Sequence, residues 1–347
     1  MADFLNRTFM QQQRLWLEVA ELALRRWDLR ADELRWLGHG SKAVIRVRAM
    51  DADYILRLYL PAQVNVKWLR SELTWLSMLQ RATDLLAPFP LPAPVNGIEE
   101  TLLELRHDRL PQARIAYAAL FEFIEGDTKS ARDLRPVDVF RVGEYLGLLH
   151  TIGQFSPPAG FDRPGLQWEG IFGDNSPYAS LAARNLIGDE QRAILDDLAL
   201  RLRRPLSNLA ARGGATGLIH ADLLAKNVVF RERTIAALDF EFCGWGFFLY
   251  DLAPLLWQLK GERARDYAEL EAAIWRGYTS IRPLADSDRE LLEPFIAARQ
   301  YASIRWLLAN LGNPAVKQVA TSLIAERCEE LKGFLESGIL RRSTPTL

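Results

Sequence analysis

Residues 217–230, Gly-Leu-Ile-His-Ala-Asp-Leu-Leu-Ala-Lys-Asn-Val-Val-Phe, decide the fold of this chain of 347 residues. The first part is a polar loop, which runs into a short apolar strand at 228–230. A charged turn follows, and a second apolar strand at 235–240 brings Asp239 back beside the loop. The stretch therefore predicts a loop, a strand, a turn and a strand that bring polar side chains together.

The polar residues of this stretch are His220, Asp222, Asn227 and Asp239. An Asp in such a loop can accept the proton of an attacking hydroxyl group. An Asn five residues later and a second Asp offer the oxygen ligands that a hard cation such as Mg²⁺ prefers. The ordered set therefore indicates a metal-assisted transfer to a hydroxyl, with Asp222 as the base.

The segment resembles the aminoglycoside phosphotransferase and choline kinase family, which includes homoserine, fructosamine and stress-response kinases. Its pattern is His-Gly-Asp-x-x-x-x-Asn, then Asp-Phe-(Glu/Asp), then Asp-Leu-Ala, the last part here being Asp251-Leu-Ala253. The resemblance covers about residues 30–310 and implies an α+β, bilobal protein-kinase-like fold. A small N-lobe with an antiparallel sheet and a larger, mainly helical C-lobe are expected.

The resemblance divides the chain into four parts: an N-terminal helix at 1–29, an N-lobe at 30–121, a hinge at 122–126 and a C-lobe at 127–347. Apolar residues at helical spacing over 9–27 predict the first helix.

Within the N-lobe, strands are expected from 34 to 48 around a glycine turn, at 54–59, and in a hairpin of 101–105 and 115–123. The proline-rich segment 83–97 is expected to be a loop, because proline cannot join a central strand ladder.

In the C-lobe, helical patterns are expected at 136–150, 180–210, 262–281, 286–311 and 315–338. His150 is expected to end the first of them as a cap. The tail 341–347 is expected to be frayed.

The expected N-lobe carries the predicted nucleotide-binding residues. Gly38 and Gly40 could let the backbone approach phosphates, and Arg57 stands where a kinase carries its phosphate-binding Lys. Glu72, on the following helix, is predicted to form an ion pair with Arg57. The hinge matches the connection between kinase lobes, where backbone groups around Glu122 and Ile124 would bind the adenine of ATP.

The resemblance also assigns roles in the C-lobe. Asp222 is the expected base, His220 braces the loop, and Asp251 accepts backbone N–H groups of the loop. The expected Mg²⁺ ligands are Asn227, Asp239 and Glu241.

One departure concerns the position two residues after the base, where relatives carry His or Lys. Leu224 stands there, and Lys226 is the nearby cation that could compensate, unless it only faces solvent.

Composition narrows the function class. A net charge of −1 gives no indication of the basic surface that nucleic-acid-binding proteins use. Cys243 and Cys328 fit no metal-binding spacing and are expected to be free thiols. The start of the chain has no signal-peptide pattern and no apolar run is long enough for a membrane span, so a cytoplasmic location is expected.

These features predict an ATP- and Mg²⁺-dependent phosphotransferase acting on a hydroxyl of a small molecule, such as an amino alcohol or amino sugar. A Ser/Thr protein kinase and a nucleotide-binding pseudokinase stay open as alternatives. Only ten residues, 241–250, separate Asp239-Phe240 from Asp251, and none is Ser or Thr, which favours a small acceptor over a protein. The oligomeric state stays open.

Overall fold

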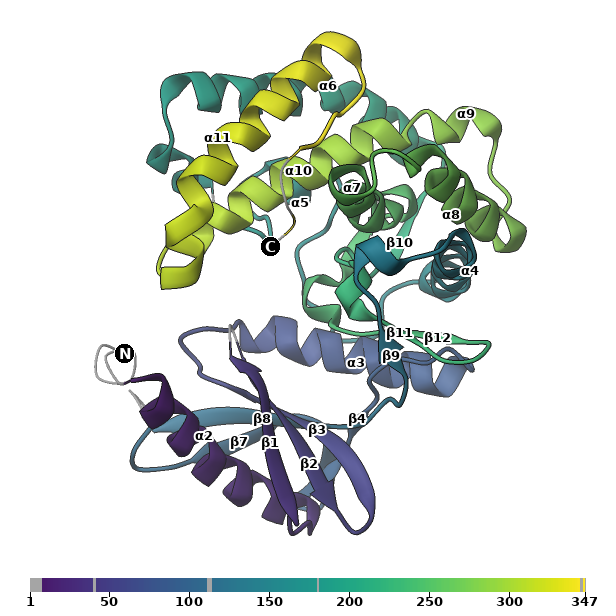
Figure 1. Cartoon of the computed structure of the whole chain (residues 1–347). Helices are drawn as coiled ribbons and strands as arrows, with labels where there is room; N and C mark the ends of the chain where they lie inside the picture. Colours follow the sequence, from purple (N-terminus) through teal and green to yellow (C-terminus); the bar gives the residue numbers. More distant parts are fainter. Residues whose placement is uncertain (1–7, 40–41, 111–113, 180, 344–345, 347) are drawn as a thin grey trace. The chain divides into compact units, whose positions relative to one another are not determined.

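The computed structural model describes residues 8–39, 42–110, 114–179, 181–343 and 346. Two compact units make up the chain: Met1–Glu125 with Pro158–Asp162, and Gly126–Pro157 with Arg163–Leu347. An antiparallel sheet dominates the first unit and helices dominate the second (Figure 1). The predicted α+β class is confirmed.

The strands of the first unit form an antiparallel sheet with the order β1-β2-β3-β8-β4, and β7 also pairs with β8. The strands are β1 (Glu33–His39), β2 (Ala43–Ala49), β3 (Ala52–Tyr59), β4 (Pro90–Leu91), β7 (Leu103–Arg106) and β8 (Ile115–Glu122). A separate hairpin joins β5 (Ala93–Val95) to β6 (Ile98–Glu100). The predicted hairpins are confirmed, although some strand ends differ by a few residues.

The prediction that 83–97 is wholly a loop is wrong, because β4 and β5 lie within it. Pro90 pairs with Phe121 of β8, and β4 is the last strand of the sheet order. An edge strand tolerates proline, since the missing N–H costs no ladder bond on the outer side.

Helix α2 (Phe9–Leu24), followed by the short turn η1 (Arg25–Trp27), confirms the first predicted helix. A capping box between Thr8 and Gln11 begins it. Its apolar side belongs to the same buried cluster as the facing side chains of the sheet, among them Leu15, Trp16, Val19, Ile45, Val47, Leu56 and Leu120. Helix α3 (Val66–Ala82) begins at Asn65, whose Oδ1 accepts hydrogen bonds from the first backbone N–H groups.

The second unit holds the remaining elements. They are β9 (Asp127–Thr128), η2 (Ala131–Asp133), α4 (Pro136–Gly153), α5 (Trp168–Phe172), η3 (Leu181–Leu186), α6 (Asp189–Ala211), β10 (Thr216–Ile219), η4 (Ala225–Asn227), β11 (Val228–Phe230), β12 (Ile235–Ala237), η5 (Phe240–Phe242), β13 (Gly244–Phe247), η6 (Phe248–Leu252), α7 (Ala253–Glu262), α8 (Tyr267–Ile281), α9 (Asp286–Arg289), α10 (Leu292–Ala309) and α11 (Pro314–Ser337). None of the helices in the described part of the chain is long and apolar enough to cross a lipid bilayer.

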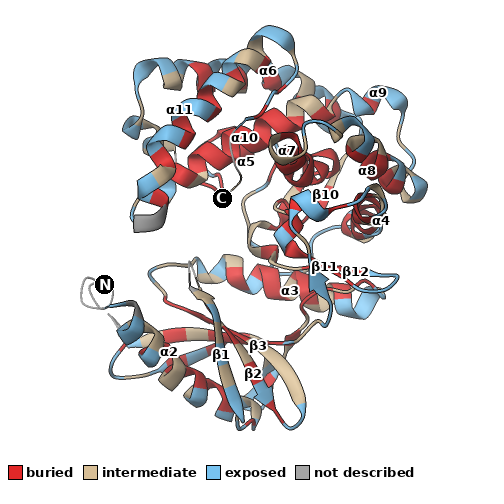
Figure 2. Cartoon of the chain, viewed as in Figure 1, coloured by how far each residue is buried: buried red, intermediate tan, exposed pale blue. Residues whose placement is uncertain are grey.

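Two helix contacts organise this unit. Helices α4 and α8 approach so closely that a Cβ on Gly143 would collide with the carbonyl of Ile274, and one on Gly277 with the carbonyl of Phe140. Helix α10 is buried along nearly its whole length, as the red ribbon in Figure 2 shows. A helix that is buried on every side is a core element rather than a surface helix.

The prediction of a frayed tail is wrong for its first part. Residues 341–343 are described, and Leu340 and Arg342 are buried. The amide of Leu340 donates to Glu293, and the guanidinium of Arg342 donates to the carbonyl of Trp257. These hydrogen bonds and the burial of the Leu340 side chain hold the segment against α7 and α10. The amide of Ser343 also donates to Glu330 of α11.

The N-terminus of α4 contains a carboxylate whose ionisation contributes to folding. Asp138 is 1% exposed and accepts hydrogen bonds from the backbone and side chain of Arg135. Its Oδ1 also forms an ion pair with Nζ of Lys129 at 2.9 Å. Burial opposes ionisation, but these partners prevail and lower the pKa of Asp138 to about 2.

We therefore expect Asp138→Asn to lower the free energy of unfolding at pH 7 by roughly 2 kcal/mol, one pKa unit being worth about 1.4 kcal/mol. Because the pKa of Asp138 is lower in the folded state, ionisation stabilises the fold at pH values above the ordinary Asp pKa. This contribution is lost as pH falls from about 4 towards 2. Urea unfolding of both proteins across this range measures it. The exposed Asp133→Asn is the control, and a wild-type advantage that persists at pH 2 would contradict the assignment.

Candidate active site

The predicted loop, strand, turn and strand are present. Strands β11 and β12 pair antiparallel, with Val228 opposite Ala237, and the amide of Arg231 closes the turn onto Thr234. The amide of Leu238 donates to the carbonyl of Asn227 at 2.7 Å, which brings the chain next to Asp239 back to the loop. Asp239 itself has a left-handed backbone, with φ of +63°.

Asp251 anchors the loop, as the resemblance implied. Its two carboxylate oxygens accept the amides of His220 at 2.8 Å and Ala221 at 2.5 Å. Ala221 has a φ of +69°, a strained conformation for a residue with a Cβ, and these bonds help to hold it. Burial raises the pKa of Asp251, but its interactions with His150 and His220 outweigh burial and lower it.

His150 extends this network into the helices. Its Nε2 lies 2.9 Å from Asp251 Oδ2 and its Nδ1 lies 2.9 Å from the hydroxyl of Tyr278. The side chain is fully buried, so the expectation of a simple helix-end cap is wrong. Burial lowers the pKa of His150 against the opposing effect of Asp251.

His220 braces the loop from within. Its Nδ1 accepts the amide of Asp222 at 3.2 Å, so its Nε2, 2.9 Å from the carbonyl of Leu238, carries the ring proton. The ring also packs against Phe240, with centroids 4.4 Å apart. Both nitrogens are engaged with the backbone, which suits a bracing residue better than a proton carrier.

Asp222 makes a contact that the sequence did not predict. Its Oδ1 accepts a hydrogen bond from Nη2 of Arg299 at 2.5 Å. Burial raises the pKa of Asp222, Arg299 opposes that effect, and Asp239 adds to it. The effect of Asp239 on the pKa of Asp222 indicates that the two carboxylates interact electrostatically.

Two tyrosines lie in the same electrostatic environment. The hydroxyls of Tyr178 and Tyr250 are 2.8 Å apart and both side chains are buried. Burial raises the pKa of Tyr250 to about 12, so both phenols stay neutral hydrogen-bonding groups. Neither tyrosine belongs to a sequence motif that would have singled it out.

The oxygen groups fit a hard divalent cation. Nδ2 of Asn227 donates to the carbonyl of Asp222 at 2.9 Å, which orients the amide and leaves its oxygen as the possible ligand. Within the described residues, no three or more His, Cys, Asp or Glu side chains gather as a metal-binding group. A Mg²⁺ ion held by Asn227 and Asp239 would therefore depend on water and phosphate oxygens for its other ligands, as is usual for this ion.

The remaining predicted residues of this unit differ in how far they are buried. Glu241 is half-buried, and its carbonyl accepts a hydrogen bond from Arg163. Lys226 is exposed, whereas Leu224 is buried in the core. The loop itself therefore places no buried cation beside Asp222.

In the first unit, the predicted ion pair is confirmed. Nη1 of Arg57 lies 2.9 Å from Oε1 of Glu72, and both side chains are buried. The guanidinium also lies 4.4 Å from the ring centroid of Phe121. The pair joins β3 to α3 on the sheet face opposite α2, since neighbouring strand residues point to opposite faces.

Of the other predicted nucleotide-binding positions, Gly38 and Glu122 are open. No described atom lies within 4 Å of a Cβ built on Gly38. Gly40 lies outside the described residues. Glu122 is exposed at the end of β8, and Ile124 is half-buried two residues later.

A model of the phosphotransferase enzyme family, which includes the aminoglycoside phosphotransferases, matches residues 33–291. The chain belongs to this family. The match spans the strand that carries Arg57, the whole loop from Gly217 to Asn227, and Asp251, so the family assignment and the geometry concern the same residues.

The named proteins to which this chain is similar are kinases. The chain is 31% identical to a homoserine kinase of Gluconobacter oxydans over 76% of this chain and 77% of that protein. It is 30% identical to a homoserine kinase of Rhodospirillum rubrum over 64% of each, so it spans less than two thirds of that relative. A solved microcompartment-associated aminopropanol kinase has a TM-score of 0.77 and 26% identity, covering 94% of this chain and 99% of that one. The chain is therefore a kinase with a hydroxyl group as acceptor.

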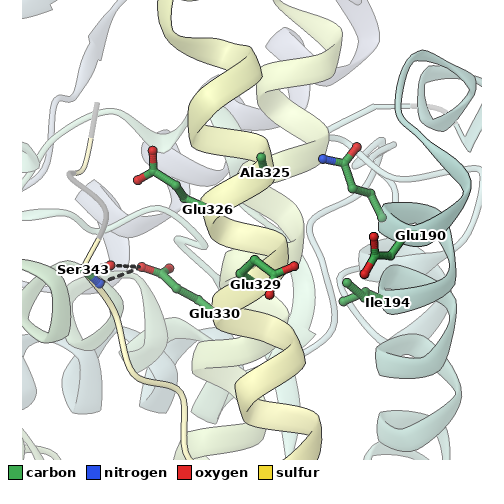
Figure 3. A pocket seen from close by; sticks show the side chains of 8 residues that line it. Glu190, Ile194, Ala325, Glu326, Glu329, Glu330 and Ser343 are labelled. Carbon is green, nitrogen blue, oxygen red and sulfur yellow. Dashed lines mark hydrogen bonds between the residues drawn. The ribbon is translucent and has the colours of Figure 1, made fainter.

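A hollow of about 480 Å³ lies elsewhere, between α6 and α11 (Figure 3). Its polar lining is mostly acidic, with Glu190, Glu326, Glu329 and Glu330. None of the predicted site residues lines it. A surface this acidic opposes the binding of a nucleotide phosphate, so it is not the candidate active site.

Proposed function

We propose that this kinase transfers the γ-phosphate of ATP, with Mg²⁺, to the hydroxyl of a small molecule, with Asp222 as the base. The observation that carries the proposal is the fixed position of Asp222. Its amide is bound to His220, its carbonyl to Asn227 and its carboxylate to Arg299. A base held by three contacts is preorganised for one geometry of the acceptor.

The metal ligands follow from the same geometry. Asn227 and Asp239 would hold Mg²⁺, with Glu241 as a further candidate. When bound, the ion neutralises charge on the phosphates during transfer. Arg57, held by Glu72, and the backbone around Gly38 and Gly40 would bind nucleotide phosphates, and the backbone at Glu122 and Ile124 would bind adenine.

A small acceptor is supported by the segment 241–250. It forms η5, β13 and η6, and most of its residues are buried. Strand β13 pairs with β10, and β10 ends directly before the catalytic loop. A protein kinase needs an accessible segment here to dock a peptide. The relatives named above include kinases of homoserine and aminopropanol, which are both small molecules with a hydroxyl group.

The acceptor side of the proposed site would include the segment around Trp168. Arg305 of α10 donates to the carbonyls of Ile171 at 3.1 Å and Gly173 at 2.8 Å, and also to that of Ala179. Nε1 of Trp168 donates to the carbonyl of Ala199 at 2.9 Å. These hydrogen bonds fix the position of the segment, so it would form a rigid side of the acceptor site.

The test is ADP formation from Mg·ATP with a panel of acceptors. The panel holds amino alcohols, homoserine and related hydroxy amino acids, amino sugars, sugars, and casein-like and myelin-type proteins. We expect turnover with at least one small hydroxyl compound, and none with proteins. Phosphorylation of proteins alone would support the protein-kinase alternative. Binding of ATP with no acceptor-dependent turnover would support the pseudokinase alternative.

A further inference from the structure

Arg299 of α10 is placed against the proposed base. Its side chain is 8% exposed, and that of Asp222 is 15% exposed, so the 2.5 Å contact is largely shielded from water. A charge-assisted hydrogen bond of this kind is stronger and more directional than a surface ion pair. The two residues are 77 positions apart in the sequence, which excludes a local helical pair.

The contact leaves one carboxylate oxygen available. Oδ1 of Asp222 is occupied by Arg299, whereas Oδ2 accepts no hydrogen bond from any residue that the structure describes. The backbone on both sides is fixed through His220 and Asn227. The free oxygen therefore has one preferred direction.

The loop itself contributes a weaker, exposed cation, because the charge of Lys226 also lowers the pKa of Asp222. Leu224 is apolar and buried, and Lys226 is exposed. Arg299 is supported from behind, since its guanidinium carbon lies 5.2 Å from the ring centroid of Trp257. Its Nε is buried and makes no hydrogen bond within the described part of the chain. The guanidinium thus has donors beyond the one that Asp222 occupies.

We propose that Arg299 is the positioning residue of the phosphoryl transfer, holding Asp222 with Oδ2 directed to the acceptor hydroxyl. The inference rests on the proposed function of Asp222. In the step, the acceptor oxygen forms its bond to the γ-phosphorus and the bond from that phosphorus to ADP breaks. The acceptor proton passes to Oδ2 of Asp222. Arg299 stays protonated throughout and balances the charge of the carboxylate before the transfer.

The chain offers a matched control. Arg327 of α11 is 2% exposed, and its guanidinium carbon also lies 5.2 Å from the Trp257 ring centroid. No contact between Arg327 and Asp222 is present among the described residues. Replacing Arg327 therefore removes a buried cation from the same indole ring without touching the base.

The experiment compares Arg299→Met, Arg299→Lys and Arg327→Met with wild type, using the best acceptor of the panel. Arg299→Met should lower kcat by roughly 10- to 100-fold, the kinetic equivalent of one charge-assisted hydrogen bond. The KM for ATP should change little, because Arg299 acts through Asp222. Arg299→Lys, which keeps the charge, should recover part of the loss. Arg327→Met should keep kcat near the wild-type value even if its Tm falls.

A double variant separates positioning from general damage. If Arg299 acts through Asp222, Arg299→Met should cost little further kcat in an Asp222→Asn background, because residues that act as a unit are not additive. Additive losses, or equal losses in Arg299→Met and Arg327→Met, would overturn the inference. Should Arg299→Met fail to fold, the smaller loss expected for Arg299→Lys is measured in both backgrounds, and a loss that is undiminished in the Asp222→Asn background would overturn the inference. Near-normal turnover of Asp222→Asn alone would instead refute the proposed base.

Discussion

Asp222→Asn is expected to lower kcat by about 10²- to 10⁴-fold, the usual range for losing a general base. The amide has almost the same shape, so the contacts of the backbone with His220 and Asn227 should persist. ATP affinity should barely change, because the base does not hold the nucleotide. Steady-state kinetics with the best acceptor, together with nucleotide titration, measure both quantities.

Glu232→Gln is a suitable control for this variant. Glu232 is exposed in the turn between β11 and β12, so its replacement removes one acidic charge from the same hairpin without touching the loop. The control should retain wild-type kcat. Near-normal turnover of Asp222→Asn would show that another group, or none, takes the proton.

Asp239→Ala is expected to abolish the Mg²⁺-dependent part of thermal stabilisation by ATP. A ligand present at 100 times its Kd stabilises a protein by about 2.7 kcal/mol, which is a measurable rise in Tm. Removing one of the few oxygen ligands leaves the ion mostly to water and phosphate, so its contribution to binding should disappear. Melting curves with ATP alone and with ATP plus Mg²⁺ isolate the metal.

The comparison with metal-free nucleotide makes this result specific. ATP without Mg²⁺ should shift wild type and Asp239→Ala by the same small amount, since that binding does not use the carboxylate. Equal Mg²⁺-dependent shifts in both proteins would exclude Asp239 as a ligand. The same series with Glu241→Gln tests whether the second carboxylate takes part.

Local patterns were sufficient for much of the site. The hairpin of β11 and β12 follows from two short apolar runs around a polar turn, and the anchor at Asp251 follows from a motif of fixed order. The pair of Arg57 and Glu72 was also predictable, because kinases pair a cation on this strand with a Glu on the next helix.

Residues brought in by tertiary packing were not predictable in this way. Arg299 belongs to a helix that is buried all round, so no amphipathic pattern marks the direction of its side chain. A charged residue in such a helix indicates a buried polar contact, but the sequence does not show which residue makes that contact with Arg299. The prediction for the tail was wrong because it rested only on the usual disorder of chain ends, whereas the guanidinium of Arg342 lies 3.7 Å from the ring centroid of Trp257.

The backbone contact between α4 and α8 has an evolutionary consequence. Neither Gly143 nor Gly277 can gain a side chain without separating the two helices. Those helices carry His150 and Tyr278, which lead to Asp251 and the loop. Substitution at either glycine would therefore disturb catalysis from a distance. We therefore expect few substitutions at Gly143 and Gly277 among related kinases, because each faces the backbone of the opposite helix.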